Sequence, residues 1–188
     1  MLPGGLDAYP ECRAKGVLVR ALLDEESNRR ALEALPAGPL LDLVRDPPMA
    51  PEWIPEVHFA ALFLAAADLR NLSDETAVAQ SRQRDTAMFQ SPAYRIMLAA
   101  ATPERLLRMS SARWANFHRG SQLELEGIAD DGVRIGIRFP LGLYDRLLMR
   151  AFGQSFAAAL ELSRAHAPIV EVEEAGLGYV RYRASWAP

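Results

Sequence analysis

The part of the chain that follows residue 120 contains two short stretches in which apolar and polar residues alternate, 121–126 and 133–139. Successive side chains of a strand point to opposite faces, so this alternation predicts two strands that each bury one face. Asp130, Asp131 and Gly132 lie between the two stretches and are residue types that favour tight turns. The pattern therefore predicts a β-hairpin whose apolar face must be covered by another part of the chain.

A long helix and a second hairpin are predicted after the first one. Apolar residues spaced three and four apart indicate a helix over residues 143–166. Two more strands are predicted at 169–173 and 177–185, with Ala175 and Gly176 between them. The resulting order is ββαββ, and hairpins favour a four-stranded antiparallel sheet.

The first two-thirds of the chain are predicted to be largely helical. Residues 16–23 are interpreted as a short strand or as a strand that leads into a helix. A loop is predicted at 46–55, because this stretch contains four prolines. Helices are predicted over residues 24–35, 56–71, 74–89 and 92–101, and from 103 to just before Gly120.

The predicted helix 74–89 has a clear start and an unusual surface. Ser73 is a typical N-cap residue, and the acids Asp74 and Glu75 suit the positive end of the helix dipole. Its middle, residues 80–85, is polar, so only a thin apolar stripe remains. We therefore expect this helix to be largely solvent-facing.

The predicted fold class is α+β, a helical N-terminal two-thirds followed by a ββαββ unit that forms a four-stranded antiparallel sheet. The chain has 188 residues, half of them hydrophobic, which suits one domain with a sizeable core. We expect a flexible N-terminal segment at 1–15 and a single α+β domain at 16–188.

Charge and composition exclude several classes of partner. The chain carries 24 acidic and 21 basic residues, a net charge of −3, so no bulk attraction to nucleic acid or to an anionic membrane surface is expected. No apolar run reaches the roughly 18 residues that a transmembrane helix needs. A single cysteine, Cys12, excludes an intrachain disulfide and fits a reducing compartment. The composition thus predicts a cytoplasmic domain.

Few residues could carry catalysis or bind a metal. His58, His118 and His166 are the three histidines, and no two of them have the spacing that places two imidazoles on one metal. Each has an ordinary structural interpretation, in a core, at an interface or at a helix end. Cys12 is interpreted as an inert thiol near the terminus, with a reactive thiol as the alternative. We therefore expect no enzymatic activity and no catalytic residue, and the sequence names no cofactor.

Residues 114–119 bring aromatic, amide, imidazole and guanidinium groups together where a predicted helix leads into a predicted strand. Binding residues are often carried at such junctions, although packing explains the same cluster. Aromatic residues of the helix 143–166 could line a pocket between helices and sheet, or form core. The predicted ligand-binding residues are Trp114, Asn116, Phe117, His118, Arg119, Phe152 and Phe156.

Several segments resemble the Myxococcales paralogous family, a domain family of unknown function. The resemblance is carried by residues 15–23, 55–59 and 103–107 and by the Trp-Ala-Asn-Phe run at 114–117, which leads into the ββαββ unit. It covers most of the chain from about residue 15. It implies an architecture, but no activity, because the family has none assigned.

The order of elements more distantly resembles a superfamily of haem nitric-oxide/oxygen-binding domains, 4-vinyl reductase domains and TRAPP trafficking subunits. That resemblance implies an apolar cavity for haem, a small molecule or an acyl chain. Its haem members need an axial histidine on the helix before the first hairpin strand, and a Tyr-x-Ser-x-Arg motif. Here the helix expected to end at Phe117 has no histidine inside it, and residues 180–185 do not reproduce the motif.

Three hypotheses follow. The first is a non-enzymatic signalling or regulatory domain that binds a small apolar ligand in a cavity between helices and sheet, and that self-associates. The second is a homodimeric protein–protein interaction module without a ligand, which uses an exposed helical face around residues 56–70. The third is a haem- or metal-dependent sensor or enzyme that uses His118 or His58.

Overall fold

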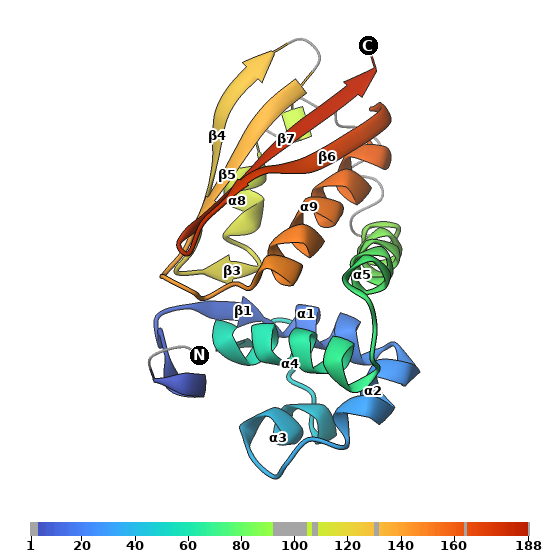
Figure 1. Ribbon diagram of the computed structural model, residues 1–188, viewed down its shortest axis with the longest axis vertical. Helices are drawn as coiled ribbons and strands as arrows, with labels where there is room; N and C mark the ends of the chain where they lie inside the picture. Colours follow the sequence, from blue (N-terminus) through green and yellow to red (C-terminus); the bar gives the residue numbers. More distant parts are fainter. Residues whose placement is uncertain (1–3, 92–104, 107–108, 130–131, 164, 188) are drawn as a thin grey trace.

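The computed structural model describes residues 4–91, 105–106, 109–129, 132–163 and 165–187, and it divides into a helical half and a sheet half (Figure 1). The helical half holds the N-terminal helices, and the sheet half holds a four-stranded sheet with a long helix against it. The predicted helix 92–101 and the start of a helix at Pro103 lie outside the described residues.

Helix α4 (Glu56–Leu69) is the centre of the helical half. It contacts α1 (Gly16–Leu23), α2 (Glu26–Leu32) and α3 (Pro39–Arg45), and its apolar residues are buried along most of its length. A helix that is apolar on nearly every side is a core helix rather than a surface helix. The exposed interaction face expected at residues 56–70 is therefore wrong.

A three-stranded antiparallel sheet joins segments that are far apart in the sequence. Strand β1 (Arg13–Lys15) lies between β2 (Trp53–Pro55) and β3 (His118–Arg119). The strand expected within 16–23 is instead helix α1, and the loop expected at 46–55 ends in β2. The sheet also includes residues before the domain boundary expected at residue 16, and Cys12 and Ala14 are fully buried.

Close contact at Gly120 allows β3 to lie beside the N-terminal segment. Gly120 has φ +80°, a conformation that side chains rarely adopt, and a Cβ added there would lie 2.5 Å from Sγ of Cys12. Only glycine lets the chain turn at this point without displacing the Cys12 side chain.

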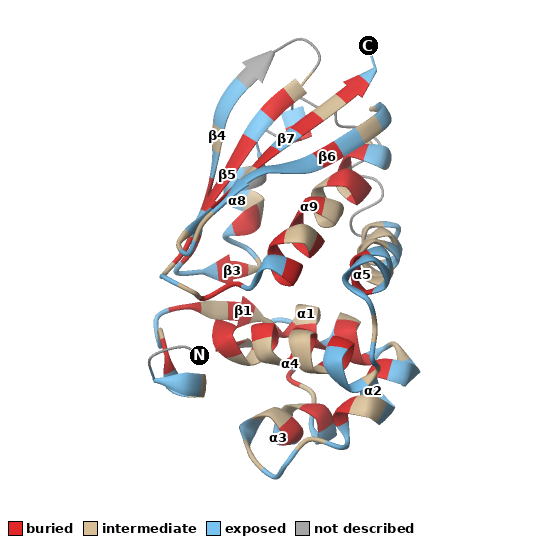
Figure 2. Ribbon diagram, in the orientation of Figure 1, coloured by how far each residue is buried: buried red, intermediate tan, exposed pale blue. Residues whose placement is uncertain are grey.

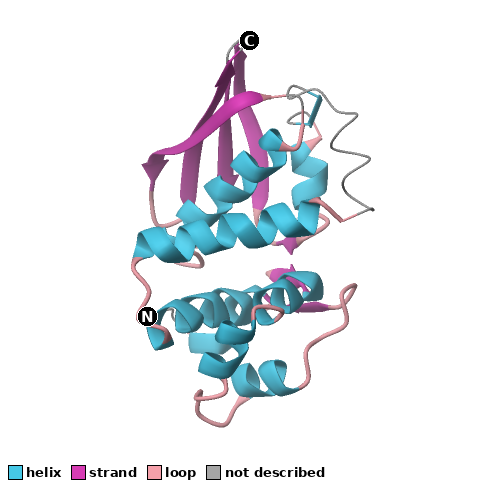
Figure 3. Cartoon of the chain, turned by 90° about the vertical axis from the view of Figure 1, so that its right-hand side faces the viewer, coloured by secondary structure: helices cyan, strands magenta, loops and turns pink. Residues whose placement is uncertain are grey.

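The closing ββαββ unit is confirmed, and with it the α+β fold class. Strands β4 (Gln122–Ala129), β5 (Gly132–Arg138), β7 (Tyr179–Ala187) and β6 (His166–Ala175) form one sheet in that order, with antiparallel neighbours. The buried face carries the alternating apolar residues of β5 and β7, whereas the other face carries ion pairs such as Arg134–Glu173. Figure 3 shows helices on one side of this sheet.

Helix α9 (Arg146–Glu161) covers the buried face of the sheet. Its start is capped by Asp145, whose side chain accepts a hydrogen bond from the N–H of Leu147. The phenolic hydroxyl of Tyr182 in β7 donates to the carbonyl of Met149 in α9 over 2.7 Å. Helix α9 is shorter than the helix expected at 143–166, and His166 begins strand β6 instead of ending a helix.

Helix α5 (Asp74–Phe89) connects the two halves by packing along α9. Its bounds and its Ser73 cap are as predicted, but the expectation that it is largely solvent-facing is wrong. Arg82 donates to Gln154 and Glu161 of α9. Figure 2 shows buried segments in both halves, and one continuous cluster of buried apolar residues extends from Ala8 to Trp186.

Candidate functional site

A pocket of about 770 Å³ lies where the helical half meets the sheet half. Its wall is built by α1, β2 and α5 on one side and by α8 (Ser110–Trp114), β3 and α9 on the other. Most described lining residues are apolar or aromatic, and polar groups lie at a few points only. Ligand pockets have this size and this composition.

All seven residues predicted to bind a ligand line this pocket. Trp114 ends α8, Asn116 and Phe117 lie in the turn that follows, and His118 and Arg119 form β3. Phe152 and Phe156 project from α9 and complete an aromatic cluster with Trp114: the ring centroids of Trp114 and Phe152 are 5.2 Å apart, edge to face. The prediction that these residues lie close together is therefore confirmed. Whether they bind a ligand remains a prediction.

His118 is held by a carboxylate that sequence analysis missed. Its Nδ1 lies 3.0 and 3.2 Å from the two carboxylate oxygens of Glu56, and the side chains are 5% and 0% exposed. When Nδ1 is protonated, it donates to the carboxylate. The other ring nitrogen, Nε2, forms no hydrogen bond with any of the described residues. Glu56 lies in the first turn of α4, so the contact joins the two halves.

Trp114 fixes the orientation of the His118 ring. The two rings stack with centroids 4.0 Å apart and planes 19° apart, and Phe152 meets the imidazole edge to face at 5.5 Å. Trp114 Nε1 donates to Ser121 over 3.0 Å, and the Ser121 hydroxyl is 3.3 Å from that of Tyr144. Burial raises the pKa of Tyr144 well above its ordinary value, with the nearby Glu56 charge acting in the same direction, so the phenol stays neutral.

A second polar group on the wall comes from the middle of α5. The Ser155 hydroxyl of α9 donates to the Asp85 carboxylate. The preceding residue of α5, Arg84, donates from Nη2 to the Ser81 hydroxyl over 3.2 Å. Burial raises the pKa of Asp85, whereas the charge of Arg84 and the Ser155 hydrogen bond oppose this shift. The polar stretch in the middle of α5 was expected to face solvent. It instead places charged groups against the pocket.

The remaining candidate residues lie outside the pocket wall. His58 is half-buried on α4, where burial lowers its pKa, and His166 is exposed on β6. Cys12 has no exposed surface, and burial raises the pKa of its thiol to about 11, with Glu11 and Glu56 acting in the same direction. Among the residues that the structure describes, no group of three or more His, Cys, Asp or Glu side chains could hold a metal ion.

The fold is similar to that of solved H-NOX domains. No protein-family model and no curated protein sequence matches the chain, so the resemblance to the Myxococcales family gains no support. A structure from a study of haem distortion in the H-NOX family has a TM-score of 0.65 at 12% identity, covering 93% of this chain and 95% of that one.

Two further structures agree with this likeness. An Fe(II) unliganded H-NOX protein from K. algicida has a TM-score of 0.63 at 11% identity, covering 93% of this chain and 97% of that one. An oxygen-binding H-NOX domain related to soluble guanylate cyclases has a TM-score of 0.62 at 12% identity, covering 92% and 93%. The distant superfamily resemblance is thus confirmed for the fold. No helix within the described part of the chain is long and apolar enough to cross a membrane.

Proposed function

We propose that this chain is a ligand-binding sensor domain that holds a small, largely apolar molecule in the pocket between its two halves. The pocket carries this proposal: about 770 Å³ lined mainly by apolar and aromatic side chains, in a chain otherwise packed into one core. Protein interiors are close-packed, so a space of this size without an occupant would forfeit many contacts. A ligand there would contact both α5 and α9, and its binding would stabilise the folded arrangement of the two halves.

Native mass spectrometry of the freshly purified protein tests this function. The mass of the native protein is compared with the mass after denaturation, and an excess that denaturation removes would be a bound molecule. The same spectra show whether the chain self-associates, which stays a prediction of the sequence.

A pocket-filling variant shows where that molecule binds. Ala159 of α9 lines the pocket, so Ala159→Phe is expected to remove the excess mass. Ala34→Phe, which adds the same ring at an exposed position after α2, is the matched control and is expected to retain it. No excess mass in the wild type, together with no binding of added apolar molecules, would overturn the proposed function.

Haem is a second candidate ligand, and His118 is the observation that favours it. The H-NOX structures with this fold concern haem proteins, one of them an oxygen-binding domain. His118 is the one histidine on the described pocket wall, and a histidine whose Nδ1 is held by a carboxylate offers Nε2 to a metal. Haem held there would supply an iron centre open to a small gaseous ligand. The missing Tyr-x-Ser-x-Arg motif makes haem the second candidate.

Absorption spectroscopy during haem titration separates the two candidates. If haem binds through His118, the wild type gives a saturable Soret shift, which His118→Gln abolishes and His58→Gln retains. Glutamine keeps a hydrogen-bond donor for Glu56, so the variant preserves the fold. A wild-type spectrum without a saturable shift would remove haem and leave the apolar-molecule proposal unaffected.

A further inference from the structure

The small sheet has one buried face and one cationic face. Ala14, at its centre, pairs with Ile54 and His118, and all three side chains are buried. The neighbouring register positions place Lys15 opposite Trp53 and Arg13 opposite Arg119. Residues directly opposite each other share a face, so this second face carries three positive charges around one aromatic ring.

Two of these charges lie against the same tryptophan. Lys15 Nζ is 4.2 Å from the centroid of the Trp53 ring, and the guanidinium carbon of Arg119 is 4.0 Å from it. The electron-rich face of an indole attracts a cation, so Trp53 holds both groups in defined positions. We call Lys15, Trp53 and Arg119 the cation clamp.

Within the described part of the chain, the clamp has no anionic partner. Among the described residues, no carboxylate lies within 4.0 Å of Lys15 or Arg119, whereas arginines elsewhere, such as Arg70 and Arg181, do have carboxylate partners. Both charges lie within 4.2 Å of one ring centroid and are therefore at most about 8 Å apart, so they repel each other. An anion that contacts both would remove that repulsion, which makes the clamp a candidate anion site.

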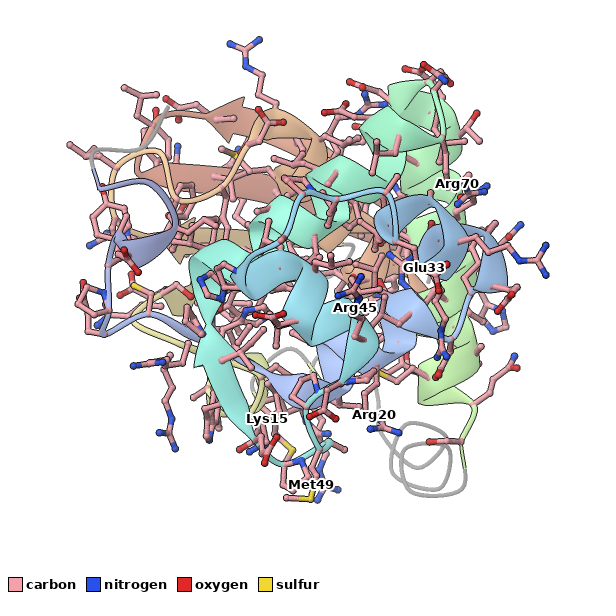
Figure 4. The ribbon with its side chains drawn as sticks, turned by 90° about the horizontal axis from the view of Figure 1, so that it is seen from below. Lys15, Arg20, Glu33, Arg45, Met49 and Arg70 are labelled. Atoms are coloured by element: carbon pink, nitrogen blue, oxygen red, sulfur yellow. The ribbon has the colours of Figure 1, made fainter. Side chains whose placement is uncertain are left out.

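The clamp belongs to the pocket. Lys15, Trp53 and Arg119 all line it, and Arg119 is exposed while the aromatic residues of α9 lie deeper. Figure 4 shows Lys15 near one edge of the molecule, with Arg20 and Met49 at the same edge. The described wall holds one carboxylate, Asp85, which lies on α5 and is engaged by Ser155.

We propose that the ligand is an organic anion with an apolar body, whose carboxylate or phosphate group is bound by Lys15 and Arg119 at the pocket mouth. This inference rests on the proposed function and names the chemical class of its ligand. The Arg119 guanidinium donates hydrogen bonds in a fork that suits two oxygens of such a group, and Lys15 adds a point charge. The apolar body then extends among Trp114, Phe152 and Phe156.

Matched pairs of probes test the charge separately from the apolar body. Dodecanoic acid and dodecanol share an alkyl chain, and naphthylacetic acid and naphthylethanol share a ring system; each pair differs by one negative charge. Calorimetric titration of the full chain is expected to show at least about tenfold tighter binding of the acid in the pair that fits, and the preference should shrink at high salt because of screening.

Variants locate the preference at the clamp. Lys15→Met with Arg119→Met keeps the apolar stems and removes both charges, so it is expected to abolish the preference for the acid and to leave binding of the alcohol within about twofold. Lys15→Arg is expected to keep the preference. Arg30→Met, which removes an exposed charge on α2 outside the pocket, is the matched control and should behave as the wild type.

The outcomes separate this inference from the function on which it rests. Equal binding of acid and alcohol by the wild type, or an acid preference that survives in the double methionine variant, would overturn the anion site and leave the apolar pocket standing. Binding of no member of either pair, together with no excess mass in the native spectra, would overturn the proposed function and the anion site together.

Discussion

Glu56 and His118 form a deeply buried polar contact behind the pocket wall, and each side chain is the other's hydrogen-bond partner. Both side chains are almost inaccessible to water, so each depends on its partner for the hydrogen bonds that water would otherwise supply. Removing one partner of such a pair leaves the other desolvated, whereas replacing both by apolar residues is often much less costly.

We predict that Glu56→Leu lowers the free energy of unfolding by about 3 kcal/mol, because the His118 ring is left buried without its acceptor. Urea unfolding followed by circular dichroism measures this loss. Glu33→Leu, at an exposed position just after α2, should change the stability by less than about 0.5 kcal/mol.

The double variant Glu56→Leu with His118→Leu is expected to be more stable than Glu56→Leu alone, since no polar group is then left unpaired. Additive losses from the two substitutions would show that the pair contributes nothing beyond its separate side chains.

Cys12 predicts a dependence of stability on alkaline pH. Its pKa is raised from 9.0 to about 11 in the folded protein, first by burial and then by Glu11 and Glu56. Below pH 9 the thiol is protonated in both states, so its contribution to stability is fully present. As the pH rises towards 11, the unfolded chain releases the proton and the folded chain keeps it, so stability falls.

The comparison of wild type with Cys12→Ala isolates this effect. Buried Tyr182 also has a raised pKa, but its cause is burial alone, so it titrates alike in both proteins and cancels in the difference. The charge of Cys12 is the smallest of the causes that raise the pKa of Tyr144, so the contribution of Tyr144 cancels almost completely. The stability advantage of the wild type over the variant should therefore shrink between pH 9 and 11. A difference that is constant across this window would contradict the assignment.

At the scale of elements, the start of α5 is the clearest test of local sequence signals. Ser73 Oγ accepts a hydrogen bond from the N–H of Thr76 over 3.3 Å. Ser73→Ala is expected to cost about 1 kcal/mol, while Ser73→Asp, which also accepts from that N–H, should retain nearly full stability. Thermal unfolding measures both, and equal losses in the two variants would mean that the hydroxyl does not act as the cap.

Elements with strong local signals were predictable, and those made by distant pairing were not. Helices α4 and α5 and both hairpins follow from apolar periodicity and from residues such as Ser73. Strands β1, β2 and β3 have two or three residues each, too few to show a period, and only their mutual pairing makes them strands. Residues 16–23 illustrate the limit, because a short, mostly apolar stretch of eight residues fits a strand or a helix equally well.

The candidate site was predictable in part, for the same reason. Residues 114–119 stand together in the sequence, and Phe152 and Phe156 lie on one face of a helix, so both groups could be recognised. Glu56 could not be assigned, because an acid in the first turn of a helix is ordinarily explained by the helix dipole. Its partner His118 is 62 positions away. The clamp likewise depends on the pairing of β1 with β2 and β3.

At the scale of the whole molecule, the two halves share one core, which predicts that they unfold together. Buried apolar residues form a single cluster across the helical half and the sheet half, and α5 packs along α9 between them. The pocket lies at the junction of the halves, but buried apolar residues still connect them. Because the core is shared, unfolding one half would expose apolar surface of the other half to water. Unfolding of one half alone is therefore unfavourable.

The three tryptophans report on this cooperativity at different places. Trp53 lies in β2, Trp114 lies in the pocket wall, and Trp186 lies near the end of β7. With fluorotryptophan incorporated, each residue gives its own fluorine resonance, assigned by single Trp→Phe variants. All three are expected to change at the same urea concentration, and a ligand of the pocket should shift all three midpoints upward together. If Trp53 and Trp186 change at separate midpoints, the halves are independent folding units, and binding at their junction would have to bring them together.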